Sequence, residues 1–193
     1  SSFVESQLKL YKNNFNSTVR FLPIDKDYKI NFKKDTIKLE MGYTLNQKLI
    51  LFFGLIRPYK GLDNLLNAVK NILLNNNIKL IIAGEAYESL GRYKSIIDQY
   101  NINKNVVWIH EFLSNNMIEK LMIASDLLVL PYKTASQSGV LSQAWQYNLP
   151  SIVTNVGGLS EYVDEGKSGY IVDSNNIHDL EQKIVSFFNS DDS

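Results

Sequence analysis

The chain has 193 residues, of which 45% are hydrophobic and 21% are charged, a composition typical of one soluble globular domain with a sizeable buried core. Twenty basic and twenty acidic residues give a formal net charge of zero, so no overall field draws the chain to nucleic acid or to an anionic bilayer. The absence of cysteine excludes disulfides, thiolate metal sites and a cysteine nucleophile. It is compatible with a cytoplasmic location, which we expect.

The first 44 residues differ from the rest of the chain. Apolar residues recur at helical spacing from Ser1 to Tyr11, which predicts an amphipathic helix, and the apolar stretch Val19 to Ile24 predicts a strand. Asp25 and Asp27 follow, and we interpret them as a solvated turn rather than as a metal-nucleotide site. The apolar runs are all far shorter than the roughly 20 residues that span a bilayer, so no transmembrane segment is expected.

From residue 48 onward, short and continuously apolar strands alternate with segments of helical period. Such strands are typical of a parallel sheet that is covered by helices on both faces. We therefore predict an α/β fold, a doubly wound and mostly parallel Rossmann-like sheet of about six strands, over residues 45–189, with a frayed tail at 190–193. The expected strands are Leu49 to Phe53, Leu80 to Ala83, Val106 to Ile109, Leu127 to Leu130, Ile152 to Thr154 and Tyr170 to Val172.

The loop after the first of these strands, Gly54 to Gly61, is the strongest candidate for chemistry. Ligands of such sheets bind outside the carboxyl ends of the strands. Arg57 and Lys60 place two cations before an expected helix at Leu62 to Leu74, where the helix dipole favours anions. A bound diphosphate would account for them, and a solvated pair of cations is the alternative. Because Lys60 lies on a loop rather than in a core, we expect it to matter for binding more than for folding.

The loop from Tyr132 to Val140 is the second candidate, between a strand and a helix that runs to about Tyr147. Ser136, Gln137 and Ser138 offer hydroxyl and amide groups, and Gly139 permits close approach of a ligand to the first helical turn. The alternative is that Ser138 only caps its helix. Metal binding is not expected, because His110 and His178 have no partner histidine or cysteine at ligand spacing.

Four motifs in order give the chain a resemblance to a known family. They are Phe53 to Leu62, Ala124 to Tyr132, Gln137 to Val140, and Pro150 to Glu161. Together they resemble the C-terminal half of group 1 glycosyltransferases, over about residues 45 to 188. In that family two Rossmann-like domains form the GT-B fold. The C-terminal domain binds a nucleotide-sugar donor such as a UDP or GDP sugar, and the N-terminal domain supplies most acceptor contacts.

The resemblance implies roles for individual residues. It makes Lys60 a catalytic diphosphate ligand with Arg57 as its companion, near Gly54, and it places Phe112 and Leu113 where the base is held. The turn that faces the sugar and the phosphates corresponds to Ser136, Gln137, Ser138, Gly139 and Val140. The family's glutamate pair is replaced by Ala135 and Gln143; Gln143 can still hydrogen-bond a diol, and Ser136 or Gln137 can substitute at the sugar.

The implied function is that of the donor-binding half of a retaining hexosyltransferase of polysaccharide biosynthesis, acting on a glycan or lipid-linked acceptor. The resemblance implies no cofactor and no metal, with the nucleoside-diphosphate sugar as substrate. Residues 1–44 would be the crossover from an N-terminal acceptor domain. Without that domain this chain is expected to be inactive. Peripheral membrane contact would be possible through the same domain. A nucleotide-binding module without catalysis and a nucleotide-sugar epimerase are the alternatives.

Overall fold

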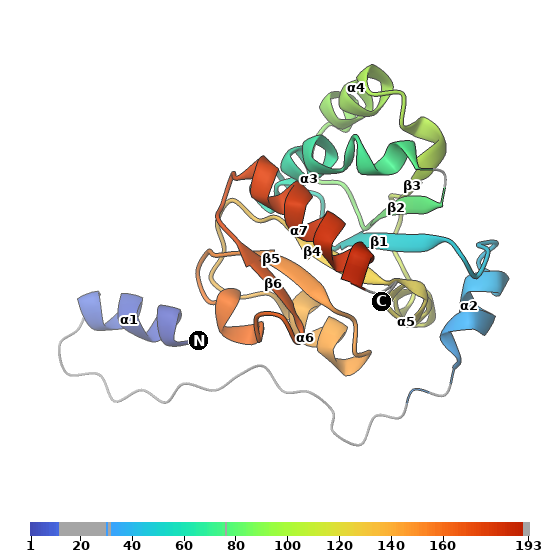
Figure 1. The fold of residues 1–193 in the computed structure, drawn as a ribbon. Helices are drawn as coiled ribbons and strands as arrows, with labels where there is room; N and C mark the ends of the chain where they lie inside the picture. Colours follow the sequence, from blue (N-terminus) through green and yellow to red (C-terminus); the bar gives the residue numbers. More distant parts are fainter. Residues whose placement is uncertain (12–29, 31, 76, 191–193) are drawn as a thin grey trace.

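The computed structural model describes residues 1–11, 30, 32–75 and 77–190 of the chain (Figure 1). Within these residues, six strands form one sheet in the order β3-β2-β1-β4-β5-β6, and every neighbouring pair is parallel. The strands are β1 (Lys48–Phe53), β2 (Ile78–Ala83), β3 (Val106–Ile109), β4 (Leu127–Leu130), β5 (Ser151–Thr154) and β6 (Gly169–Val172). The predicted doubly wound sheet is confirmed, and the observed strands match the predicted ones to within two residues at either end.

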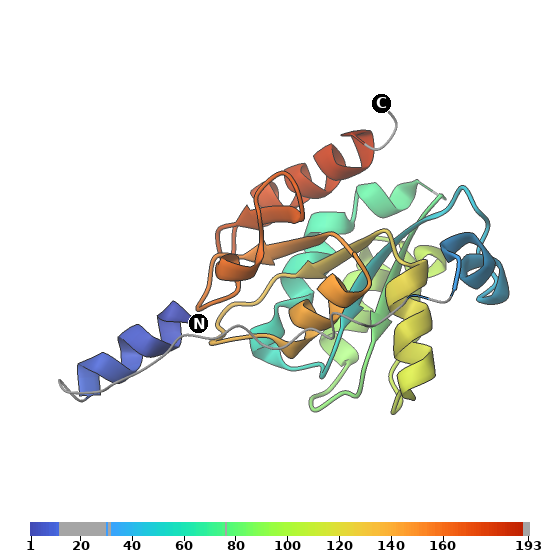
Figure 2. The same cartoon turned by 90° about the horizontal axis from the view of Figure 1, so that it is seen from below.

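Two layers of helices cover the two faces of the sheet. Alternate residues of β1 point to opposite faces, so Ile50 packs with α3 (Leu62–Val69), α4 (Gly91–Gln99) and α7 (Ile177–Ser190). Its neighbours Leu49 and Leu51 pack instead with α2 (Lys34–Glu40), α5 (Asn115–Ala124) and α6 (Gly139–Gln146). Figure 2 shows α7 and α6 on opposite sides of the strands. Burial on both faces explains why the strands are continuously apolar.

The helix predicted over Leu62 to Leu74 is interrupted. The α-helix α3 ends at Val69, and the tighter 3₁₀ turn η2 (Ile72–Leu74) follows. Within η2, Leu73 is fully buried, and its carbonyl accepts a hydrogen bond from the side-chain amide of Asn105. This long-range contact fixes Leu73 in the core, a tertiary effect that a local helical period does not contain.

Three further 3₁₀ turns and one short helix complete the description. The turns η1 (Pro58–Lys60), η3 (Asn103–Asn105) and η4 (Ser160–Tyr162) lie in connections between larger elements. The helix α2 was not predicted from the sequence, although its residue Ile37 is fully buried. At the other end of the chain α7 includes Ser190, so the helix extends one residue into the predicted tail.

The N-terminal helix α1 (Ser2–Tyr11) forms where the sequence predicted it. It projects away from the sheet, with its first turn beside the loops that follow β5 (Figures 1 and 2). The strand predicted at Val19 to Ile24 and the pair Asp25 and Asp27 lie outside the described residues.

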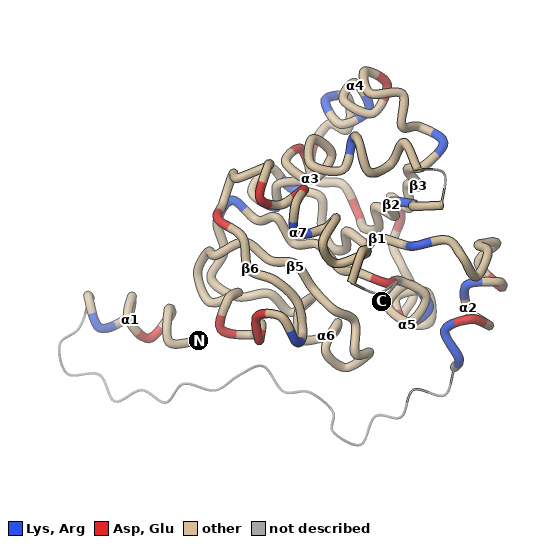
Figure 3. The backbone as a smooth tube through the Cα atoms, viewed as in Figure 1, with Lys and Arg blue, Asp and Glu red and all other residues tan. Residues whose placement is uncertain are grey.

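Charged residues of both signs are interspersed over the fold (Figure 3). In the part of the chain that the structure describes, no helix is long and apolar enough to cross a membrane.

Candidate functional site

The order of the strands defines a crevice between β1 and β4. These strands are neighbours, but the chain leaves β1 toward α3 and leaves β4 toward α6, which lie on opposite faces of the sheet. The loops that follow β1 and β4 therefore diverge at this point, and ligands of doubly wound sheets bind in such a crevice. Both loops are those that the sequence selected as candidates for chemistry.

The two loops are in direct contact through Gly61. Its φ is +69°, and a Cβ atom at this position would lie 2.0 Å from the carbonyl oxygen of Pro131. Only glycine fits such a contact without displacing the backbone. The main-chain N–H of Lys133 also donates to the carbonyl of Tyr59 at 2.7 Å. The residues before α3 are therefore held firmly against the residues after β4.

Lys60 is buried in this crevice, with 7% of its surface exposed. Its Nζ donates a hydrogen bond of 2.8 Å to the hydroxyl of Tyr132 and lies 3.0 Å from the position of a Cβ atom built on Gly54. Among the described residues, no ion pair joins Lys60 to a carboxylate. Lys60 thus lies on the loop after β1, as expected, but it is buried there, because the tight turn η1 folds its side chain back between the two loops.

The surroundings of Lys60 disfavour its charge. Burial, followed by the positive charge of Arg57, lowers the pKa of Lys60 from 10.5 to about 8. A bound anion would reverse both effects, because an opposite charge favours the ammonium form. The site therefore contains a buried cation that lacks a counter-charge from the described protein residues.

Arg57 is more exposed than Lys60 and lies toward the loop after β2. Its guanidinium carbon is 4.9 Å from the centre of the Tyr87 ring, and the hydroxyl of Tyr87 donates to Glu85 at 3.3 Å. A guanidinium stacked on an aromatic ring keeps its N–H donors free in the plane of the group. Arg57 can thus turn these donors toward an anion beside Lys60.

Tyr132 links Lys60 to the start of α6. Burial raises the pKa of Tyr132 to about 12, with a hydrogen bond from Ser138 acting in the opposite direction, so its hydroxyl is neutral near pH 7. The carbonyl of Tyr132 accepts a bond of 2.6 Å from the hydroxyl of Thr154 on β5. The sequence reasoning did not select Tyr132, although its place directly after a buried strand was the available signal.

The first turn of α6 faces the same crevice. Val140 lies 3.4 Å from the position of a Cβ atom on Gly54, whereas Gly139 is exposed and a Cβ built on it meets no other atom within 4 Å. Ser138 makes no side-chain capping bond to the helix. Ser138 is the N-cap residue of α6 by position, and its hydroxyl acts on the pKa of Tyr132. The helix N-terminus is left with N–H groups that can meet an anion.

A pocket of about 220 Å³ adjoins the crevice at the ends of β1, β2 and β3. Phe112 is 89% exposed at this pocket, and Leu113 is half-buried. The structure thus brings the two predicted base-binding residues to one pocket with Gly54. The lining residues are Phe53, Gly54, Leu55, Gly84, Glu85, Glu111, Phe112, Leu113 and Ile118.

The remaining predicted residues lie around the start of α6. Ser136 and Gln143 are exposed, and Gln137 is half-buried. Of the predicted residues, Gly54, Lys60, Ser138 and Val140 are joined by the contacts described above, and Gln143 is one full helical turn farther along α6. No group of three or more His, Cys, Asp or Glu side chains suited to hold a metal occurs among the described residues.

Comparisons with known proteins bear on the family and the fold of this chain. The family model described as "Glycosyl transferases group 1" matches residues 33–193. The chain belongs to this family. Glycosyltransferase MJ1178 of Methanocaldococcus jannaschii is 31% identical over 145 residues, which cover 74% of this chain and 38% of that protein. The predicted resemblance is confirmed, and the match begins before residue 45 because it includes α2.

Solved structures of other glycosyltransferases share the fold. HepE of Anabaena, crystallised with UDP and glucose, matches with a TM-score of 0.72 and 19% identity over 82% of this chain and 43% of that chain. Sucrose-phosphate synthase of Thermosynechococcus elongatus matches with a TM-score of 0.79 and 17% identity over 96% of this chain and 47% of that chain. This chain therefore spans less than half the length of these group 1 relatives and fold neighbours.

Proposed function

We propose that this chain binds the nucleoside-diphosphate sugar donor of a glycosyltransferase that works in the cytoplasm. The observation that carries the proposal is the buried Lys60, whose charge is disfavoured until an anion enters the crevice between β1 and β4. Group 1 membership and the UDP held by HepE support a nucleotide-sugar as that anion. A glycan or lipid-linked acceptor would be bound by a further N-terminal domain.

The site has the groups that glycosyl transfer needs at the leaving diphosphate. As the bond between the anomeric carbon and the phosphate oxygen breaks, negative charge develops on the diphosphate. Lys60 and Arg57 supply fixed positive charge there, and the N–H groups at the start of α6 supply hydrogen bonds. Preorganised charge of this kind lowers the barrier without reorganisation at the moment of reaction.

The other predicted residues would orient the donor. Phe112 and Leu113 border the pocket of about 220 Å³, which we assign to the base. Ser136 and Gln137 lie before α6, where we place the sugar, and Gln143 would hydrogen-bond the ribose hydroxyls as a neutral donor and acceptor. We further propose retention of the anomeric configuration, with the acceptor attacking from the side of the departing diphosphate.

Thermal unfolding in the presence of nucleotides tests the donor site. The chain is screened with UDP, GDP, ADP, CMP and dTDP and their sugars, in EDTA and in magnesium. At about 100 times the dissociation constant, a bound donor stabilises the fold by about 2.7 kcal/mol. We expect one base to give this response without magnesium. A chain that responds to none of these compounds in either buffer would contradict the proposal.

A matched pair of variants locates the response. Lys60→Met removes the buried cation, whereas Lys94→Met removes an exposed lysine on α4, away from the crevice. We expect the nucleotide response to disappear in Lys60→Met and to persist in Lys94→Met. A response that survives in both variants would place the nucleotide elsewhere.

A further inference from the structure

The first turn of α1 is held by one side chain of the body, Glu161. The main-chain N–H groups of Ser2 and Phe3 donate to the two carboxylate oxygens of Glu161, at 2.9 Å and 3.0 Å. The hydroxyl of Ser1 accepts from the N–H of Val4 at 3.4 Å. A carboxylate at a helix N-terminus also meets the positive end of the helix dipole. Three of the N–H groups that a helix leaves unpaired are therefore satisfied at this contact.

Glu161 lies in a turn that packs against the hydrophobic core. It is the middle residue of the turn η4, and its neighbour Tyr162 is buried against Trp145, with ring centres 5.4 Å apart. Burial alone would raise the pKa of Glu161, but the hydrogen bonds from Phe3 and Ser2 together outweigh it and hold the pKa below its ordinary value. The carboxylate thus presents a fixed negative charge to α1.

The same contact lies against the sugar side of the proposed donor site. Ser1 is buried, and its Oγ lies 2.5 Å from the position that a Cβ atom on Gly158 would occupy. The carbonyl oxygen of Ser136 lies 3.0 Å from that position and accepts a hydrogen bond of 3.0 Å from the N–H of Gly158. Only a residue without a side chain leaves room here, so Gly158 brings Ser1 and Ser136 together.

The loop after β5 is equally close to the turn before α6. Gly157 has a φ of +57°, and a Cβ atom there would lie 1.8 Å from the carbonyl oxygen of Ala135. The main chain at Ala135 and Ser136 therefore rests directly on Gly157 and Gly158. A shift of the turn that meets the donor must be transmitted to the loop that holds α1, since close-packed contacts are not freely deformable.

We propose that Glu161 is a latch that fixes residues 1–11 against the donor edge of the sheet and couples their position to donor binding. The inference rests on the proposed function for the identity of the donor. With the latch closed, the first turn of α1 forms part of the wall beside Ser136. With the latch open, α1 is released and Ser136 loses this support, so the donor binds more weakly.

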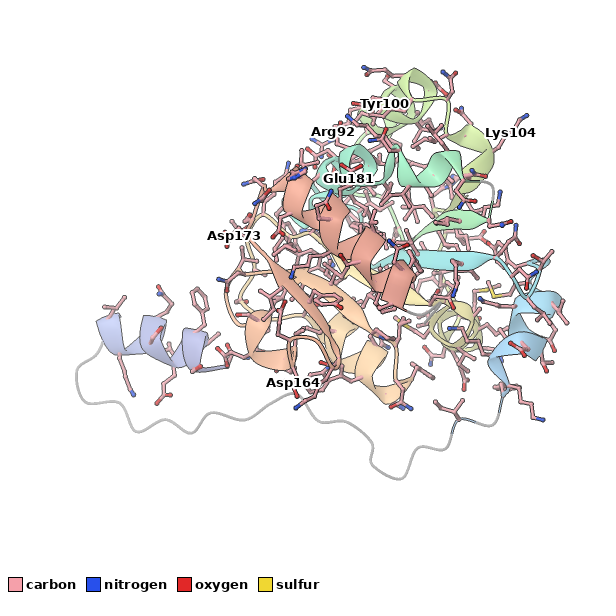
Figure 4. All side chains as sticks on the ribbon, viewed as in Figure 1. Arg92, Tyr100, Lys104, Asp164, Asp173 and Glu181 are labelled. Atoms are coloured by element: carbon pink, nitrogen blue, oxygen red, sulfur yellow. The ribbon has the colours of Figure 1, made fainter. Side chains whose placement is uncertain are left out.

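Distances between spin labels test the latch without any nucleotide. The chain has no cysteine, so two introduced cysteines give two unique labelling sites. They are Gln7→Cys on α1 and Lys104→Cys at the far end of the molecule, where Figure 4 labels Lys104. Both side chains are exposed. We expect one narrow distance distribution with Glu161 present, a broad one in Glu161→Ala, and an intermediate one in Glu161→Gln, whose amide oxygen still accepts a bond.

Asp164→Ala is the matched control, because Asp164 is an exposed carboxylate three residues away whose partner is Lys167 (Figure 4). Its distribution should equal that of the unmodified chain. A broad distribution before substitution, or an equally narrow one in Glu161→Ala, would overturn the latch.

Donor affinity tests the coupling. The dissociation constant of the nucleotide that gives the strongest thermal response should rise at least about fivefold in Glu161→Ala and stay unchanged in Asp164→Ala. An equal constant in Glu161→Ala and in the unmodified chain would overturn the coupling. If no nucleotide binds to the unmodified chain, the proposed function and the coupling both fail, whereas the label distances still decide whether Glu161 holds α1.

Discussion

Two lysines, Lys38 and Lys60, are buried in the described part of the molecule, and they lie at opposite edges of the sheet. At the amino edge, the Nζ of Lys38 donates to both carboxylate oxygens of Asp126, at 2.9 Å and 3.2 Å, and to the carbonyl of Gln47 at 2.8 Å. At the carboxyl edge, the Nζ of Lys60 donates to the neutral hydroxyl of Tyr132. One buried cation has its counter-charge, and the other has only a dipole.

The amino edge is a completed structural cluster. Asp126 also accepts from the N–H of Leu49 at 2.7 Å and pairs with Lys34 at 2.6 Å. Burial alone would raise the pKa of Asp126, but the hydrogen bond and charge of Lys34, with the bonds from Lys38 and Leu49, outweigh it and lower the pKa. The cluster joins α2 to the starts of β1 and β4, so its charges serve the fold.

The carboxyl edge has the same burial without the same compensation. Burying a charge is costly unless it is paired, and a group in this position usually responds by a shift in its pKa, as Lys60 does. We propose that such a cation is retained for an anionic partner that arrives from outside. The comparison teaches that a buried lysine paired with a carboxylate serves the fold, and we propose that a buried lysine without a counter-charge serves binding.

Of the substitutions at the two buried lysines and their partners, removal of Asp126 should have the largest effect on stability. Asp126→Ala leaves Lys38 buried without its carboxylate and Leu49 without its acceptor, so we expect the free energy of unfolding to fall by about 3 to 5 kcal/mol. Urea denaturation measures this loss. Nucleotide affinity of the remaining folded protein should be unchanged. A loss below about 1 kcal/mol would mean that Lys38 finds another partner.

The loss should also depend on pH. Since the pKa of Asp126 is lower in the folded chain than in the unfolded one, its contribution is full above its unfolded value and disappears as the pH falls through its folded value. Unmodified chain and Asp126→Ala should therefore become more similar in acid.

Substitution of Lys60 should raise the stability of the fold, whereas Asp126→Ala should lower it. One pKa unit corresponds to about 1.36 kcal/mol, so the lowering from 10.5 to about 8 means that charged Lys60 costs the fold on the order of 3 kcal/mol. Lys60→Met keeps most of the volume and loses the bond to Tyr132, so we expect a net gain in stability of about 1 to 2 kcal/mol.

The same variant should weaken nucleotide binding by about 1.5 to 3 kcal/mol, the value of a hydrogen bond to a charged group. Calorimetric titration and urea denaturation on one preparation give both quantities. If the variant binds normally or is strongly destabilised, Lys60 has a structural role like that of Lys38.

Alkaline pH should reproduce part of the effect of Lys60→Met, because it removes the charge of Lys60. In the folded chain Lys60 titrates near pH 8 and in the unfolded chain near 10.5, so between these values the folded state binds fewer protons and its stability rises relative to Lys60→Met. Below pH 8 the full cost of the charge is present. The stability gap between the two chains should therefore narrow from pH 8 to pH 10.5, and nucleotide affinity of the unmodified chain should fall. A gap that is constant over this range would contradict the lowered pKa.

The strands of the sheet, and the loops that carry the site, could be predicted from the sequence because their signals are local. Continuous apolar runs define β1 to β6, and Gly54 and Gly139 mark the loops that follow them. The burial of Lys60 could not be predicted, because it depends on how η1 meets Tyr132, 72 residues away. The break after α3 and the contact of Glu161 with α1 are long-range in the same way.

The smallest expected effect on stability is that of removing the Tyr132 hydroxyl, which accepts the hydrogen bond from Lys60. Tyr132→Phe removes the acceptor of the bond from Lys60 and little volume, so we expect a loss of stability of about 0.5 to 1.5 kcal/mol. Because a diphosphate would offer Lys60 stronger acceptors than a phenol, nucleotide affinity should change by less than about threefold. In Lys60→Met the hydroxyl has lost this donor, so adding Tyr132→Phe should cost less stability than it does in the unmodified chain. A double-mutant cycle measures this difference. Equal costs in the two backgrounds would show that Tyr132 does not stabilise the Lys60 ammonium, and the comparison between the two buried lysines would then have to explain Lys60 without any polar partner.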